Sequence, residues 1–137
     1  MGLTAREDSP RGPCSPARPS PILGRAPLFA PGPMIHDEIR HLLDAPVTGP
    51  TAPSLAAIEH TLTAGYAEAL ALEAERWRLE RRVAEVAARL GHGEPAHEDE
   101  LAGLGRRLSA TSRELNGLRQ LLDGLRDRAA AVRAAAA

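Results

Sequence analysis

The chain has 137 residues, a formal net charge of −1 and only three aromatic side chains, Phe29, Tyr66 and Trp77. This length allows at most one ordinary domain, and the scarcity of aromatic and β-branched residues favours helices over a sheet. The near-zero net charge excludes a global field that would draw the chain to nucleic acid or to an anionic membrane.

Residues 1–33 contain eight of the twelve prolines and four arginines, with almost no periodic apolar pattern. Such a segment cannot bury enough apolar surface to offset the entropy lost on ordering, so we predict that it is disordered. A second interpretation stays open. Met34 starts the first stretch that resembles protein-coding sequence, and residues 1–33 would then be an upstream extension from a misassigned start.

Four apolar residues with i, i+4, i+7 and i+8 spacing predict a short amphipathic helix over residues 34–45. They are Ile35, Ile39, Leu42 and Leu43. A helix of about ten residues is marginal in isolation and must dock on another element to persist. Three prolines within residues 46–53 predict a stiff linker after it.

A long helix is predicted over residues 54–90. It begins near Ser54, and it stops at Gly91, a residue able to take the left-handed cap conformation. Its core positions, spaced by a heptad, are apolar except for Gly65 and Arg76. They are Leu55, Ile58, Leu62, Gly65, Ala69, Leu72, Arg76, Leu79, Val83, Val86 and Leu90.

A second long helix is predicted over residues 98–135, with Thr111 as the only polar core position. The series is Leu101, Leu104, Leu108, Thr111, Leu115, Leu118, Leu122, Leu125, Ala129 and Val132. Three acidic residues, 98–100, occupy its first turn, where negative charge complements the helix dipole.

The turn over residues 91–97 contains two glycines and a proline, so it cannot continue a helix. Its shortness predicts that the two long helices are antiparallel neighbours. The predicted fold is therefore all-α, an antiparallel two-helix coiled-coil hairpin with a short N-terminal helix and a disordered Pro/Arg-rich segment. One register consistent with the ladders places Gly65 beside Ala129. The charged flanks then predict the ion pairs Arg89–Glu100, Arg82–Glu114 and Glu68–Arg128.

Two helices alone leave much of their surface wet, so we expect a further layer, either a second copy of the chain or another helical protein. Tyr66, Leu70 and Trp77 lie outside the predicted seam and form one candidate surface. A stripe of small residues on the second helix, which includes Gly103, Gly117 and Gly124, forms another. Two simpler interpretations stay open. The small residues can reflect base composition, and Tyr66 or Trp77 can cover the docked helix over residues 34–45.

Enzymatic and cofactor-dependent functions are disfavoured. The chain has no Lys for a phosphate-binding loop, and a two-helix hairpin offers no deep pocket. With Cys14 as the only cysteine, a disulfide within the chain and a cysteine zinc site are excluded. Glu38 with His41, and Glu94 with His97, have the spacing of di-iron ligands, but neither pair lies in the middle of a core. We therefore expect no cofactor and no metal.

The function predicted is a non-enzymatic coiled-coil module for self-association or partner binding, most simply a homodimeric four-helix assembly in the bacterial cytoplasm. No apolar run is long enough to span a membrane. One alternative is a weak nucleic-acid-associated regulator that uses the Arg-rich end of the second helix, and another is a helical chaperone. The arginines of the first alternative are Arg119, Arg126, Arg128 and Arg133.

Overall fold

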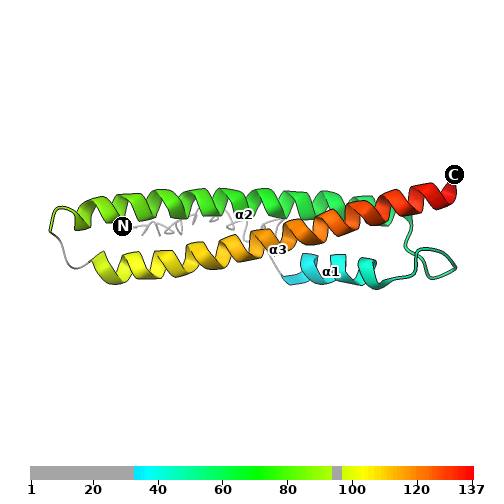
Figure 1. The fold of residues 1–137 in the computed structure, drawn as a ribbon, viewed down its shortest axis with the longest axis horizontal. Coiled ribbons are helices and arrows are strands. Elements are labelled where there is room, and N and C mark those ends of the chain that lie inside the picture. The colour runs from blue at the N-terminus through cyan, green and yellow to red at the C-terminus, as the bar shows by residue number, and fades with distance from the viewer. Residues whose placement is uncertain (1–32, 94–96) are drawn as a thin grey trace, which may run out of the picture. The chain divides into compact units, whose positions relative to one another are not determined.

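This computed structural model describes residues 33–93 and 97–137, and these residues contain three α-helices (Figure 1). They are α1 (Pro33–Asp44), α2 (Leu55–Leu90) and α3 (Glu98–Ala136). The described residues form no strand, which confirms the prediction of an all-α protein. Both interpretations of residues 1–33 concern a segment that lies, apart from Pro33, outside these residues.

Helix α2 begins where a side chain satisfies one of its free backbone N–H groups. Ser54 is extended, and its hydroxyl accepts a hydrogen bond from Ala57 N at 3.1 Å. At the other end, Gly91 keeps right-handed angles, with φ −60° and ψ −18°. The expected left-handed cap at Gly91 is therefore wrong. Gly93 has positive φ instead, 88°, and two backbone hydrogen bonds, from His92 N to Arg89 O and from Gly93 N to Leu90 O, follow the end of the helix.

Helix α3 starts with Glu98, Asp99 and Glu100 in its first turn and has Arg133 in its last. Both ends therefore carry the charge that the helix dipole favours. Among the described residues, no helix is long and apolar enough to cross a membrane.

The apolar ladders of α2 and α3 are buried in two clusters of unequal size. The turn cluster, near residues 91–97, contains Leu79, Val86 and Leu104. The large cluster lies toward the other end and includes residues from all three helices. It contains Ile39, Leu42, Ile58, Leu62, Ala69, Leu72, Leu115, Leu118, Leu122, Leu125 and Ala129.

The register of α2 against α3 differs by one heptad from the predicted register. A Cβ added at Gly65 would lie 2.5 Å from Leu122 Cδ2, so Gly65 faces Leu122 and not Ala129. Registers that differ by a heptad bury the same ladder positions, so the ladders alone cannot choose between them. The length of the connection selects the register, because a short connection pairs residues that lie at equal distances along the chain from its centre.

Four ion pairs join α2 to α3 in this register. They are Arg82–Glu100, Glu75–Arg107, Glu73–Arg119 and Glu59–Arg133. Residues later in α2 pair with residues earlier in α3, as expected for antiparallel helices. The predicted pairs of Glu100 with Arg89 and of Glu114 with Arg82 are wrong, because Arg82 and Glu100 bind each other at 2.5 Å. The predicted pair Glu68–Arg128 is also wrong, since Arg128 binds α1.

Helix α1 packs against both long helices at the end remote from the turn (Figure 1). Its Ile39 is fully buried within the large cluster. Two hydrogen bonds join it to the long helices: Thr61 Oγ1 donates to Glu38 Oε1 at 2.9 Å, and Arg128 Nη1 donates to Leu43 O at 3.3 Å. The large cluster is therefore a three-helix core, whereas the turn cluster is built by α2 and α3 alone.

Candidate interaction surface

Three large apolar side chains remain exposed on α2, and we refer to them together as the α2 flank. They are Tyr66, Leu70 and Trp77, with 43%, 66% and 63% of their surface accessible. Their i, i+4, i+11 spacing places them on one side of the helix. An exposed apolar group on one face of a helix is a candidate interaction surface.

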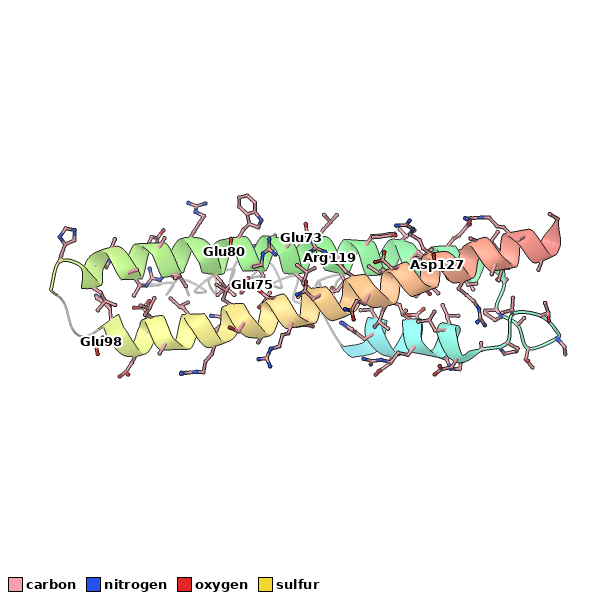
Figure 2. All side chains as sticks on the ribbon, viewed as in Figure 1. Glu73, Glu75, Glu80, Glu98, Arg119 and Asp127 are labelled. Atoms are coloured by element: carbon pink, nitrogen blue, oxygen red, sulfur yellow. The ribbon has the colours of Figure 1, made fainter. Side chains whose placement is uncertain are left out.

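A groove of about 390 Å³ adjoins the α2 flank where α2 and α3 meet. Tyr66, Ala69, Leu70 and Glu73 line it from α2, and Arg119, Leu122 and Asp123 line it from α3. Glu73 and Arg119 form an ion pair across it, and Figure 2 labels both residues where α2 and α3 run side by side. Its walls are mainly apolar, with two carboxylates and one guanidinium at the rim.

Helix α1 packs on the other side of the α2–α3 seam from the α2 flank. On α2 its contacts are with Thr61, which binds Glu38, and with Gly65, which lies near Ile39 Cδ1. Because α1 leaves Trp77 and Leu70 open to solvent, the interpretation that the aromatic residues cover the docked helix is wrong. Among the described residues, neither α1 nor α3 covers these two side chains.

The predicted stripe of small residues on α3 does not join the α2 flank. A Cβ at Gly124 would lie 3.6 Å from Leu43 Cδ2, so Gly124 is under α1. Gly117, one heptad away on the same side of α3, has no other atom within 4 Å of such a Cβ, and Gly103 has only Arg106 Nη2 at 3.8 Å. The stripe therefore packs against α1 at Gly124, whereas Gly117 and Gly103 do not contact α1.

A second groove, of about 430 Å³, lies between α2 and α3 and has an acidic lining. It contains Glu68, Glu75 and Glu114 together with Ala71, Leu72, Arg78 and Thr111. Glu68 is only 6% exposed. Burial raises the pKa of its carboxyl above the ordinary value of 4.5, and Glu114 raises it further, while His36 of α1 lowers it.

The four arginines proposed for nucleic-acid contact all have acceptors in the structure. Arg119 binds Glu73, Arg133 binds Glu59 at 2.5 Å, and Arg126 lies 3.8 Å from Asp123. Arg128 donates to Leu43 O, and its Nε and Nη2 are buried without a hydrogen-bond partner. Phosphate binding by these side chains would have to displace existing partners, which weakens the electrostatic gain from neutralising phosphates.

Within residues 33–93 and 97–137, no group of three His, Cys, Asp or Glu side chains is placed to hold a metal ion. Comparisons with protein-family models, with curated proteins and with solved structures found no match to this chain. The physical character of its surfaces is therefore the basis for assigning a role.

Sequence reasoning identified Tyr66, Leu70 and Trp77 but not the groove beside them. It did not identify Glu73, Arg119 and Asp123 as residues that line this groove. The missing information was the register, because the rim of an interhelical groove depends on which turn of α3 faces which turn of α2.

Proposed function

We propose that the chain is a non-enzymatic coiled-coil module whose α2 flank binds a helix, either from a second copy of the chain or from another protein. The observation that supports this is the exposure of Leu70 and Trp77 beside an apolar groove, while most ladder positions between α2 and α3 are buried. Burying such side chains against a partner yields about 1.5–3 kcal/mol for each one removed from water. The proposed site of action is the bacterial cytoplasm, a reducing compartment compatible with a single cysteine.

Two other roles are weaker candidates. Nucleic-acid binding through Arg119, Arg126, Arg128 and Arg133 is opposed by the acceptors that these side chains already have. A chaperone role would use the same α2 flank and differs from the proposal only in what the flank holds.

The test is to place a charge on the α2 flank and measure association. Leu70→Glu and Trp77→Glu should each lower the assembly mass by light scattering, or abolish capture of a helical partner, with the helix content unchanged by circular dichroism. Each should weaken binding by at least about 2 kcal/mol, the scale of an interface hot spot. Met34→Glu is the matched control, since Met34 is 78% exposed on α1, away from the groove.

If both flank variants associate as the wild type does, the α2 flank is not an interaction surface and the proposal fails. Loss of association in the Met34→Glu control as well would point to a general effect of added charge.

A further inference from the structure

We infer that the occupant of the α2 flank is a second copy of this chain, whose α2 lies antiparallel to the first about a two-fold axis between Glu73 and Ala74. This inference rests on the proposed function and specifies its partner. In this register Leu70 of one copy faces Trp77 of the other, and Tyr66 faces Arg81. A two-fold interface of this kind uses the same patch on both copies, so the patch must be complementary to itself.

Shape provides the first complementarity. The flank carries a protruding side chain, Trp77, and a hollow, the groove beside Tyr66 and Leu70. Trp77 lies seven residues from Leu70, about 10 Å along the helix. A two-fold axis midway between them places the indole of each copy against the groove of the other. The two-fold rotation therefore covers Trp77 and Leu70 on both copies.

Charge provides the second complementarity. The groove has two carboxylates, Glu73 and Asp123, against the single guanidinium of Arg119. At the opposite end of the flank, Arg81 is exposed and forms no ion pair with any described residue. The antiparallel register brings the guanidinium of Arg81 of each copy toward Tyr66 and Asp123 of the other, where cation–π and ionic attraction act together.

A parallel pairing lacks both features. It would place Arg81 beside Arg81 of the second copy, so that like charges repel, and it would place Trp77 against Trp77 and away from the groove. The acidic groove on the α1 side is a poorer site for a second copy, because Glu68, Glu75 and Glu114 line it on both copies.

Cysteine cross-linking of the full-length chain tests the register. In a background with Cys14→Ser, the variant Ala74→Cys places a thiol close to the axis, where it meets its counterpart. Ala84→Cys is the matched control on the same exposed side of α2. In the proposed register its two copies are about 30 Å apart, at about 1.5 Å of rise per residue. We expect a covalent dimer from Ala74→Cys under mild oxidation and none from Ala84→Cys.

Cross-linking through Ala84→Cys in place of Ala74→Cys would overturn the register, yet it would leave the proposed function intact if Leu70→Glu still dissociates the dimer. If the chain remains monomeric up to about 1 mM, the inference that a second copy occupies the α2 flank is wrong. The proposed function would then be tested separately, by capture of another helical protein through the α2 flank.

The charge complementarity has its own readout. Arg81→Glu should raise the dimer dissociation constant about tenfold, because it replaces attraction at Tyr66 and Asp123 by repulsion. Arg113→Glu, an exposed arginine on α3 outside the groove, should leave the constant unchanged. Equal effects of the two variants would contradict the assigned pairing of Arg81 with the groove.

Discussion

Gly65 in α2 and Gly117 in α3 have opposite surroundings. At Gly65 an added Cβ would lie 2.5 Å from Leu122 Cδ2 and 3.4 Å from Ile39 Cδ1, whereas at Gly117 it would meet nothing within 4 Å. Glycine in a helix costs about 1 kcal/mol relative to alanine. Gly117→Ala should therefore raise the free energy of unfolding by about 0.5–1 kcal/mol.

The same substitution at Gly65 should have the opposite sign. The Cδ2 methyl group of Leu122 would have to shift within the three-helix core, and overpacking of this kind typically costs about 1–3 kcal/mol. We expect Gly65→Ala to lower the free energy of unfolding by about 1 kcal/mol in urea titrations. Equal stabilisation by both variants would show that α1 and Leu122 move aside freely and that the observed close packing at Gly65 is not required.

The buried carboxyl of Glu68 predicts a pH-dependent effect on stability. Because burial raises its pKa, the folded protein holds the proton more tightly than the unfolded chain, whose value is near 4.5. Ionisation therefore costs folding free energy as pH rises through 4.5 to the higher folded-state pKa, and the cost persists above that range. Glu68→Gln should stabilise the protein at pH 7, with a gain that shrinks toward zero below about pH 4.5.

Urea titrations at several pH values measure this difference. Glu85→Gln is a suitable control, since Glu85 is an exposed carboxylate that lies 3.5 Å from Arg82. A gain from Glu68→Gln that does not depend on pH would mean that the glutamine acts by packing and not by removing a buried charge.

At the scale of elements, the pairing register of α2 and α3 can be tested through the ion pair beside the turn. Arg82 donates to Glu100 through both Nε and Nη2, and this bond lowers the pKa of Glu100. A double-mutant cycle of Arg82→Ala and Glu100→Gln should show favourable coupling above pH 4.5. The coupling should vanish as pH falls and Glu100 becomes protonated.

A second cycle, of Arg89→Ala with Glu100→Gln, is the control. The register first expected from the sequence pairs these two residues, whereas the structure pairs Arg82 with Glu100. Coupling of Arg89 with Glu100, without coupling of Arg82 with Glu100, would support the register predicted from the sequence, in which Gly65 lies beside Ala129.

These elements also show what the sequence could predict. Heptad spacing identified both long helices and most of their buried residues, because it reports local geometry directly. The register was not predictable from that spacing, since a shift of one heptad buries the same side chains. The docking side of α1 was hidden for another reason: it uses Thr61, a polar residue that is buried here and would ordinarily be exposed. The groove beside Tyr66 depends on the register, so it could not be predicted either.

Across the described residues, the two core clusters differ in the number of helices that enclose them. The large cluster is covered by α1, whereas Leu79, Val86 and Leu104 form a narrow two-helix seam. Local stability follows the amount of buried apolar contact. The turn end should therefore open more often than the end that α1 covers, even though both ends belong to the same pair of helices.

Hydrogen exchange followed by mass spectrometry measures this gradient. Amides of residues 79–90 and 98–108 should exchange at least about tenfold faster than those of residues 58–72 and 115–129. Ile39→Ala should reduce the difference, because Ile39 is fully buried and its truncation costs about 2–5 kcal/mol in a core that α1 helps to close. Met34→Ala, at an exposed position on the same helix, should leave the gradient unchanged. Uniform exchange along both long helices in the wild type would mean that an additional partner, and not α1, sets the stability of the hairpin.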